Sequence, residues 1–595
     1  MAEKRNKFDV DEELQAEFNA DQLKKIGHYL KKYKTSIAIS VVIILISSLA
    51  NLVTPLLLKY AIDDFLPNKN VSKLIIACVV FVAIIIISSI SMKYRIRWMT
   101  NIGQSIVADI RKDLFVHIQK LPFTYFDSRP HGKILVRVVN YVNALSNLLS
   151  NGFINLITDC FTFIITLIIM YSLHWRLSLV VTAFVPVAGV LIFTIKTKQR
   201  KSMQEVSAKQ SNMNAYIHES ISGMKVTQSF TREDMNFQIF NNIMDEYQEK
   251  WMTSRKYVGL IWPIVKNVSI LSQGVMLLVA LLVMKESVTV GLIVAFMGYT
   301  GNFWMPLLNI SEFYNQLVAA SAYLERIFET MEVKPEIQNV KEAYDLPLIK
   351  GNVSFKDVVF GYEEGQVILE NFNLDVKIGE TIALVGPTGA GKTTVVNLIS
   401  RFYDVTSGQV LIDGHDIRAV KLDSLRKQMG IMMQDTFIFS GTIMDNIRYG
   451  KLDATDEEVI EAAKVVKAHD FIVEMEDGYY TEVNERGSRL STGQRQLISF
   501  ARALLVDPKV LILDEATSSI DTNTERVLQA GLEKLLEGRT SFVVAHRLST
   551  IKNADRILVI NNKGIEEIGN HNELMKNKGR YYDLYQAQIK FLKQA

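Results

Sequence analysis

The chain has 595 residues, which is too many for one hydrophobic core, so several domains are expected. Hydrophobic residues make up 49% of the chain and gather in its first 330 positions, which indicates a membrane half followed by a soluble half. The formal net charge of +3 argues against nucleic acid as the principal partner. Cys78 and Cys160 both lie inside apolar runs, so we expect two buried, inert thiols rather than a disulfide framework.

The first 34 residues are predicted to form a charged tail and then an amphipathic helix. Within residues 21–34, Leu23, Ile26 and Leu30 recur at helical spacing among lysines. This pattern is typical of a helix that lies along the inner membrane surface. Because the apolar face is narrow, an ordinary solvated helix is the other interpretation.

Six apolar segments follow, and together they predict an all-α transmembrane domain over residues 35–331. Each is close to the ~20 residues that cross a bilayer as a helix. The segments are residues 37–58, 74–92, 153–173, 177–195, 258–284 and 287–311.

Two of these segments carry an ionisable residue, Asp159 and Lys266. Charged groups are costly in lipid, so both side chains should face the bundle interior, a water-filled cavity or the membrane edge. Lys266 can extend to the headgroups, and Asp159 can lie near them, so a contact with substrate is only one interpretation.

The connections between the segments alternate in length and charge. The second and fourth, residues 93–152 and 196–257, hold nine and ten Lys or Arg, whereas the short ones hold three, one and one. By the positive-inside tendency, the long connections and both termini are expected to be cytoplasmic. The helical pattern of the long connections predicts that the membrane helices continue into the cytosol.

The pattern of apolar residues changes where the soluble half begins. The last membrane helix is predicted to run to about residue 331, and residues 332–348, which contain Pro335 and Pro347, are predicted to be a linker. From residue 349 to 595, short β-rich runs alternate with helical stretches, the pattern of an α/β domain. The predicted strands are residues 353–360, 381–385, 410–412, 510–513, 540–545 and 556–560.

Residues 381–394, TIALVGPTGAGKTT, carry the strongest motif in the chain. A short strand is followed by a glycine-rich loop and a helix, and Gly386 to Thr393 match the phosphate-binding pattern G-x-x-x-x-G-K-[ST]. The glycines allow backbone N–H groups to turn toward a phosphate, Lys392 adds a positive charge, and Thr393 can ligate Mg²⁺. The fold class predicted here is therefore an α/β P-loop nucleotide-binding domain.

A second acidic motif, Asp514-Glu515, follows the apolar run 510–513. At the tip of a buried strand, Asp514 can hold Mg²⁺ through water, and Glu515 can polarise the attacking water. Together with the phosphate loop about 120 residues earlier, this pair predicts hydrolysis of a nucleoside triphosphate.

At residues 490–494, LSTGQ resembles the signature motif of ATP-binding cassette (ABC) proteins. The phosphate loop, Gln434, the Asp514-Glu515 pair, the segment Ser519–Asp521 and His546 occur in that family's order and spacing, and Tyr362 matches its adenine-stacking position. The segment 485–487 also looks like the exporter-specific one before the signature. The whole chain is similar to bacterial half-transporters of the type IV exporter class, which implies the bacterial cytoplasmic membrane.

The resemblance implies a role for each matching residue. Glu515 and His546 would be catalytic, Thr393, Gln434 and Asp514 would hold Mg²⁺, and Ser491 would bind the γ-phosphate held by a second copy of the domain. Short helices near residues 125–133 and 218–225 would couple the two halves. The residues expected to hold ATP are Tyr362, Gly386, Pro387, Thr388, Gly389, Ala390, Gly391, Lys392, Thr393, Thr394, Gln434, Ser491, Gly493 and Gln494.

The sequence favours ATP-driven export of a hydrophobic or amphiphilic compound, either drug-like or lipid. A soluble cassette ATPase that acts on DNA or ribosomes would not carry six membrane segments. An importer or an ATP-gated regulatory membrane protein on the same scaffold stays open at this point.

The partner is expected to be a second half-transporter, because each ATP in the family lies between two chains. Thr492 stands where the family commonly has glycine, while Asp514, Glu515 and His546 look intact. This combination favours an asymmetric heterodimer over a homodimer in which the threonine is simply tolerated.

Overall fold

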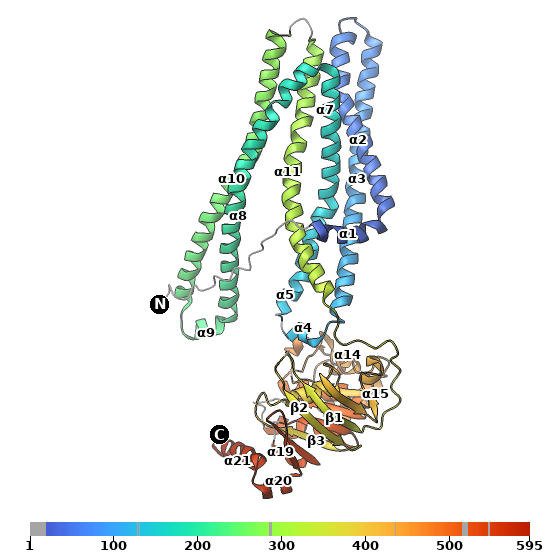
Figure 1. Ribbon diagram of the computed structural model, residues 1–595, viewed down its shortest axis with the longest axis vertical. Coiled ribbons are helices and arrows are strands. Elements are labelled where there is room, and N and C mark those ends of the chain that lie inside the picture. The colour runs from blue at the N-terminus through green and yellow to red at the C-terminus, as the bar shows by residue number, and fades with distance from the viewer. Residues whose placement is uncertain are drawn as a thin grey trace. The chain divides into compact units, whose positions relative to one another are not determined.

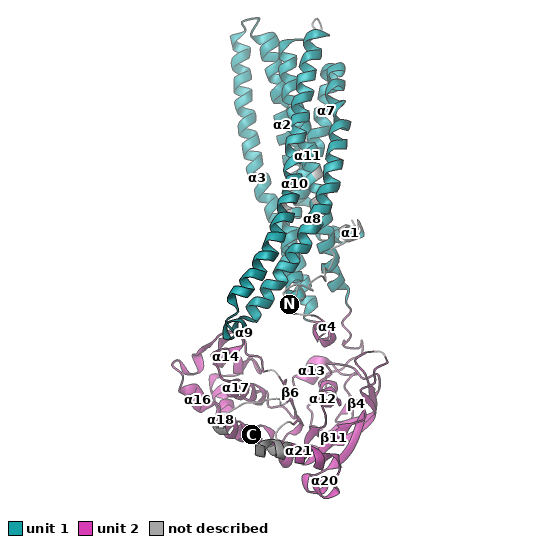
Figure 2. Ribbon diagram, turned by 90° about the vertical axis from the view of Figure 1, so that its left-hand side faces the viewer, with its two compact units in different colours: residues 1–119, 131–333 teal, residues 120–130, 334–595 magenta. Residues whose placement is uncertain are grey.

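The computed structural model describes residues 20–127, 129, 131–284, 288–363, 365–434, 436–514, 522–545 and 548–594. The chain divides into two compact units, which we describe separately (Figure 2). The first comprises Met1–Gln119 and His131–Val333, and the second comprises Lys120–Pro130 and Lys334–Ala595. A short segment from the N-terminal half of the chain, Lys120–Pro130, therefore belongs to the unit that the C-terminal half mainly forms.

The described part of the first unit is helical (Figure 1). Prolines inside α2, α10 and α11 do not end these helices. The helices are α1 (Ala20–Lys32), α2 (Lys34–Tyr60), the π-helix Ala61–Phe65, α3 (Val71–Ile118), α5 (His131–Val136), the π-helix Arg137–Tyr141, α6 (Val142–Asn147), the π-helix Leu148–Gly152, α7 (Phe153–Thr182), α8 (Phe184–Ser222), α9 (Met224–Ser229), α10 (Glu233–Leu282) and α11 (Val290–Glu332).

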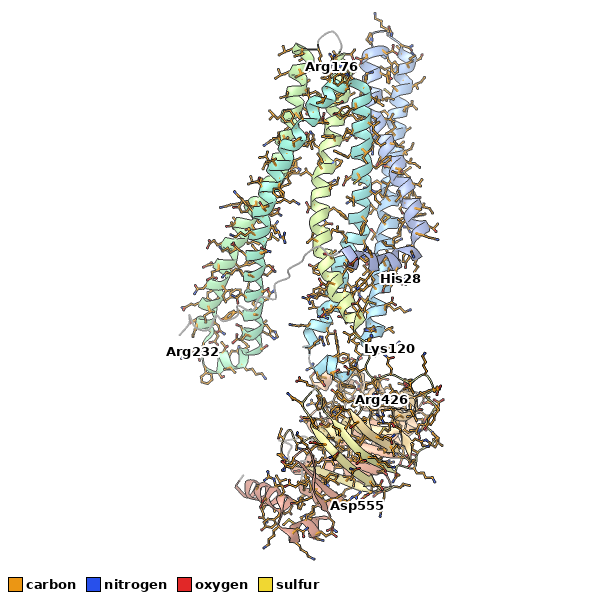
Figure 3. All side chains as sticks on the ribbon, in the orientation of Figure 1. His28, Lys120, Arg176, Arg232, Arg426 and Asp555 are labelled. Atoms are coloured by element: carbon orange, nitrogen blue, oxygen red, sulfur yellow. The ribbon has the colours of Figure 1, made fainter. Side chains whose placement is uncertain are left out.

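Within the described residues, five stretches are long and apolar enough to cross a membrane. They are Lys34–Phe65, Val71–Ile118, Asn155–Ser222, Glu233–Leu282 and Val290–Ile310. The third stretch holds most of the expected segment 153–173 and all of 177–195. Only one residue between these two segments, His174, departs from helical geometry (φ −161°, ψ 96°), so the helix α7 continues across the turn. The turn at Arg176 and the one at Arg232 lie at opposite ends of the unit (Figure 3).

The interior of the membrane unit is built around α11. Tyr299 and Trp304 on this helix are buried, and Tyr299 donates a hydrogen bond of 2.7 Å to the carbonyl of Leu52 on α2. Trp304 donates one of 3.2 Å to Ser272 on α10. These bonds satisfy polar groups that lipid would leave unpaired, so α11 holds α2 and α10 in register.

The two ionisable residues of the apolar segments have different surroundings. Asn309 of α11 donates to one Asp159 oxygen at 3.2 Å, and the other oxygen is buried. Asp159 therefore faces the bundle interior, one of the expected positions. Lys266 is exposed, with its ammonium 4.5 Å from the centre of the Trp262 ring.

The helix at the N-terminus packs on the bundle. Ile26 is almost fully buried, and Lys32 and Tyr33 both bond to Asp109 of α3, at 2.7 and 2.9 Å. The predicted place of this helix on the membrane surface stays a prediction. The expectation of two buried thiols is wrong for Cys78, which is exposed on α3 because this helix turns much of its apolar surface outward, and Cys160 is only half-buried.

The second unit is α/β, as predicted. A six-stranded sheet has the order β12-β11-β3-β10-β9-β6, and a four-stranded antiparallel sheet has the order β2-β1-β4-β5. All neighbours in the larger sheet are parallel except β12 with β11. The strands are β1 (Val353–Phe360), β2 (Leu369–Val376), β3 (Thr381–Val385), β4 (Ser407–Ile412), β5 (His415–Asp416), β6 (Met429–Met432), β7 (Gly441–Thr442), β8 (Glu482–Val483), β9 (Val510–Asp514), β10 (Thr540–Val544), β11 (Arg556–Asn561) and β12 (Gly564–Gly569).

The larger sheet is covered on both faces. Successive residues of β3 point to opposite sides, so Ile382 and Leu384 join one hydrophobic cluster and Ala383 and Val385 join the other. The helices of this unit are α4 (Phe123–Asp127), α12 (Lys392–Ile399), α13 (Leu422–Arg426), α14 (Ile443–Arg448), α15 (Asp456–Val465), α16 (His469–Val473), α17 (Thr492–Leu505), α18 (Thr522–Leu536), α19 (Leu548–Asn553), α20 (His571–Asn577) and α21 (Arg580–Gln594), with 3₁₀ turns at Gly478–Tyr480 and Glu485–Gly487.

Candidate nucleotide site

The glycine-rich loop lies between β3 and α12, as the motif predicts. Gly386, Gly389 and Gly391 have φ values of +149°, +82° and +103°, which residues with a Cβ rarely adopt. At Gly386 there is also no room, because a Cβ would lie 2.2 Å from the carbonyl oxygen of Ile560 on β11. The neighbouring strand therefore fixes the start of the loop.

Lys392 begins α12 and folds back over the loop. Its ammonium donates to the carbonyls of Gly386 and Pro387, at 2.9 and 3.0 Å, and the residue is 8% exposed. Burial lowers the pKa of Lys392, and the negative charge of Asp514 partly opposes this shift. A phosphate on the loop would offer this cation a stronger acceptor than two neutral carbonyls.

The acidic motif lies beside the loop because of the strand order. β10 pairs in parallel with β3 on one side and β9 on the other, so the carboxyl ends of all three strands reach the same edge. There the Thr393 hydroxyl donates to the Asp514 carboxylate at 3.2 Å. Gln434 follows β6, the next strand, and lines the same small cavity as Asp514.

These three residues fit a magnesium ion. Mg²⁺ prefers oxygen ligands and keeps several waters, so a hydroxyl, a carboxylate and an amide oxygen around a phosphate are sufficient. The contact between Thr393 and Asp514 shows that two of the three expected ligands already converge.

The catalytic candidates Glu515 and His546 lie outside the described residues, as does the segment Ser519–Asp521. Their strands are described, however: Glu515 follows β9 and His546 follows Ala545, the residue after β10. Val544 pairs directly with Asp514, so the described ends of these two strands are neighbours at the edge that carries the phosphate loop.

Tyr362 lies beside the first turn of α12. Its hydroxyl is 3.2 Å from that of Thr394 and accepts from Asn397 at 3.5 Å, and 42% of the residue is exposed. Its ring meets Tyr403 edge to face at 5.0 Å. An aromatic ring that is anchored on one side and open on the other is suited to stacking on a base.

Asn397 and Tyr403 belong to none of the motifs described above. The position of Asn397 could have been predicted from the sequence, because it lies about one helical turn after Thr394 and so on the same face of the helix. The position of Tyr403 could not, because it contacts Tyr362 only through the tertiary fold.

The loop also borders a surface cavity of about 280 Å³. Its other walls come from the residues before and at the start of β2 and from the turn between β11 and β12. The lining residues are Val367, Ile368, Pro387, Thr388, Gly389, Ala390, Asn561, Asn562 and Lys563.

The segment that resembles the ABC signature forms the start of α17. Ser491 is the N-cap: it accepts from the Gln494 N–H at 3.2 Å and its own N–H donates to the Gln494 side chain at 2.9 Å. Gly493 is buried against Thr524, where a Cβ would come within 2.3 Å. Thr492 is exposed, and its hydroxyl accepts from Arg495 at 3.1 Å.

Comparisons with known proteins agree with this arrangement. Residues 37–307 match the family described as the ABC transporter transmembrane region, and residues 369–518 match the one described as ABC transporter. The chain is 42% identical over 584 residues to the uncharacterized ABC transporter ATP-binding protein YknV of Bacillus subtilis (strain 168), covering 98% of this chain and 97% of that one.

Two further relatives have descriptive names. The putative multidrug export ATP-binding/permease protein YgaD of Bacillus subtilis (strain 168) is 38% identical over 574 residues, which is 95% of this chain and 99% of that one. The ATP-dependent lipid A-core flippase of Syntrophus aciditrophicus (strain SB) is 35% identical over 571 residues, which is 96% and 95% of the two chains.

A solved structure shares the architecture. The structure of a bacterial Atm1-family ABC exporter with ATP bound superposes with a TM-score of 0.78 at 27% identity, over 93% of this chain and 98% of that one. The chain therefore belongs to the ABC transporter family, as an ATP-hydrolysing half-transporter of the exporter class.

Proposed function

We propose that this chain pairs with a second half-transporter and uses ATP to export hydrophobic or amphiphilic compounds across the bacterial cytoplasmic membrane. The observation that carries the proposal is the convergence of the phosphate loop, Thr393 and Asp514 on a chain whose other half consists of membrane-length helices. Both termini and the long connections lie in the cytoplasm in this proposal, following the distribution of Lys and Arg.

Each site residue has a proposed role in ATP binding. The loop N–H groups and Lys392 hold the phosphates, Tyr362 stacks on the base, and Thr393, Gln434 and Asp514 hold Mg²⁺. Bound there, Mg²⁺ would neutralise phosphate charge. Glu515 polarises the attacking water, and His546 donates a hydrogen bond to the γ-phosphate.

The second half of each ATP site comes from the partner in this proposal. The start of α17, where Ser491 is exposed and Gly493 and Gln494 follow it, faces the γ-phosphate held by the other chain in this proposal, because a helix N-terminus attracts anions. Thr492 is exposed, and its side chain would keep the backbone of this segment farther from that phosphate than a glycine would. We therefore favour a heterodimer in which this chain's Glu515 works with the partner's signature.

The helices α8 and α10 support a dimer. They pack on each other, and toward α9 they diverge from the other long helices of the unit (Figure 1). Around the tip, Val226, Phe230 and Phe237 are each more than 60% exposed. An apolar tip on a pair of packed helices is suited to docking on a nucleotide-binding domain. Closure of two such domains would then move the membrane helices and open the substrate pathway toward the outside of the cell.

The substrate class rests on the apolar character of the membrane unit and on the relatives. One similar protein is named for multidrug export and another for lipid A-core flipping. A lipid is amphiphilic and many drugs are hydrophobic, so we propose a cargo of this kind for this chain, entering from the inner leaflet or the cytosol.

The test is ATP-dependent transport in inside-out vesicles. Export predicts that the vesicles accumulate an amphiphilic dye when ATP is added outside. Glu515→Gln should still bind ATP, but its turnover should fall by at least the ~10²-fold typical of losing a general base. Lys392→Ala should instead weaken ATP binding itself. Loss of preloaded dye from inside-out vesicles would indicate import, and unchanged ATPase activity in Glu515→Gln would remove that residue's role.

A further inference from the structure

The turn that follows α12, residues Arg401–Asp404, meets three other parts of the second unit. α12 begins at the phosphate loop and is only eight residues long, so its C-terminal end lies about 12 Å from the loop. Arg401 has φ +50°, which bends the chain sharply after the helix. The three consecutive side chains Arg401, Phe402 and Tyr403 then make separate contacts.

Tyr403 lies between Tyr362 and the inserted segment Lys120–Pro130. Its ring meets the Tyr362 ring edge to face, with the centroids 5.0 Å apart and the planes at 87°. Its hydroxyl donates a hydrogen bond of 3.0 Å to Asp127, at the end of α4. The residue is only 8% exposed, and burial together with Asp127 raises the pKa of Tyr403, so the phenol keeps its proton and stays a donor.

Phe402 makes the second contact with the same segment. Its ring centroid is 4.4 Å from that of Phe123, the first residue of α4. On α13, Arg426, which Figure 3 labels, places its guanidinium 5.1 Å from the centre of the Phe402 ring. Phe402 is therefore held in position by one neighbour while it packs on α4.

Arg401 reaches the chain that enters the second unit from α11. Its side chain is 1% exposed and donates to the carbonyl of Gln338, in the predicted linker, at 3.2 Å. It also bonds to Asp404 at 3.0 Å and to the carbonyl of Val420 at 3.2 Å. A buried guanidinium with this many partners is rigid, because each lost bond would leave a charge unsatisfied.

We infer that Tyr403 is a positioning residue through which ATP bound at Tyr362 and the phosphate loop fixes the segment Lys120–Pro130. The inference rests on the proposed ATP site. A base stacked on Tyr362 restricts that ring, the edge-to-face contact restricts Tyr403, and the phenol holds Asp127.

A second route runs along α12. Phosphate bound at its N-terminus immobilises the helix, whose far end carries Phe402 and Tyr403. Since residues Lys120–Pro130 join Gln119 to His131 in the first unit, order imposed on this segment acts on the chain that continues as α3 and α5. The arrangement thus links nucleotide occupancy to the membrane helices without requiring hydrolysis.

Hydrogen exchange on the full-length protein in lipid nanodiscs tests this. The nucleotide is the non-hydrolysable analogue adenylyl imidodiphosphate with Mg²⁺, and the two peptides followed cover residues 386–394 and 120–130. In the wild type, nucleotide should slow exchange in both. In Tyr403→Phe and in Asp127→Ala, which remove the donor and the acceptor of this bond, the phosphate-loop peptide should stay protected, while protection of 120–130 should fall about tenfold, the scale of one hydrogen bond to a charged group.

Controls separate this role from a general loss of structure. Tyr480→Phe removes a similar phenol bond to a carboxylate, the one of 2.8 Å to Asp456, and should leave both peptides protected. The double variant Tyr403→Phe/Asp127→Ala should behave like either single variant, because each substitution removes the same bond. Tyr403→Phe keeps the ring, so its melting temperature should stay close to that of the wild type.

The outcomes are distinct. Nucleotide-dependent protection of 120–130 that persists in Tyr403→Phe overturns the inference, as does a wild type in which only the phosphate loop responds. A wild type in which nucleotide protects neither peptide overturns the proposed ATP site, and the inference with it.

Discussion

Gly386 shows how one residue can fix the phosphate loop. Its φ of +149° and the Ile560 carbonyl oxygen, 2.2 Å from where a Cβ would lie, leave no room for a side chain. Gly389 differs, because its φ is +82° but no atom lies within 4 Å of such a Cβ. Two glycines of one motif are thus required for different reasons: one for space and conformation, the other for conformation alone.

We therefore expect Gly386→Ala and Gly389→Ala to differ in stability. Gly386→Ala should lower the free energy of unfolding by about 3 kcal/mol or more, since a backbone atom must move. Gly389→Ala should cost only about 1–2 kcal/mol, the strain of a left-handed alanine. Thermal unfolding without nucleotide measures both. Equal losses would show that the Ile560 contact does not constrain the loop.

At the scale of elements, the start of α17 combines a structural role with a proposed functional one. Ser491 and Gln494 form a capping box, and Thr455 and Glu458 form another at the start of α15. The second box has bonds of 2.9 and 3.3 Å, close to those of the first. The pair therefore offers a matched comparison inside one domain.

Ser491→Ala and Thr455→Ala should each cost about 1 kcal/mol of stability, the usual value of an N-cap. Only Ser491→Ala should also reduce ATPase activity, because the proposed γ-phosphate contact is lost with the cap. Unfolding curves and steady-state ATPase of the assembled transporter give the two readouts. An equal effect of both variants on turnover would mean that Ser491 acts only through helix stability.

In the membrane unit, the neighbouring residues Asp63 and Asp64 allow a similar comparison, because only Asp63 contacts the beginning of α11. Asp63 accepts from the Thr289 hydroxyl at 2.5 Å and from the Gly291 N–H at 2.8 Å, so it ties the end of the first membrane stretch to the start of the last. Its neighbour Asp64 bonds locally to Asn68 at 2.7 Å and lies 3.7 Å from Lys73.

Asp63→Ala should destabilise the protein by about 1–3 kcal/mol, because it leaves a partly buried N–H without its acceptor. Asp64→Ala should cost less than about 1 kcal/mol, as for exposed ion pairs. Thermal unfolding in nanodiscs compares them. If Asp64→Ala proves the more damaging, the contact between the two helices is not what stabilises this end.

For the assembled transporter, the question to test is whether the partner is a different half-transporter or a second copy of this chain. The heterodimer proposal predicts that the chain purified after expression alone lacks substrate-stimulated ATPase activity, and that co-expression with a second half-transporter restores it. Size-exclusion chromatography with light scattering, together with ATPase assays, gives the answer. A stable, stimulated homodimer would reject the proposal.

Thr492→Gly provides a further arm of that test. In the proposed heterodimer, the partner's chain would lack a functional catalytic glutamate. The signature of this chain, which holds Thr492, would face the partner's ATP, so Thr492→Gly should change total turnover little. In a homodimer, it would alter both working sites at once, so any effect on turnover would be larger. The substitution also removes the bond from Arg495 to Thr492, and a melting curve is the control for that loss.

Much of the fold could be predicted because its signals are local. The strand at residues 353–360 and the one at 381–385 are confirmed to the residue, since alternation and glycine-rich turns depend only on neighbours in the chain. The signal for the turn at His174 was also local, because residues 174–176, which include His174 and Arg176, separate two apolar runs. The exposure of a side chain cannot be predicted from its neighbours in the chain in the same way. Cys78 illustrates this, because an apolar run does not indicate which face of a helix packs against the rest of the protein.

The two kinds of domain, the phosphate loop and the acidic strand end can be predicted from the sequence, because each depends on residues close together in the chain. Which strand ends meet depends on the tertiary fold, since β10 lies between β3 and β9 through packing on both faces of the sheet. The contact of Tyr403 with Asp127, 276 residues away, depends on the tertiary fold as well. Spacing along the chain carries no information about such a contact, because the packing of whole elements sets it.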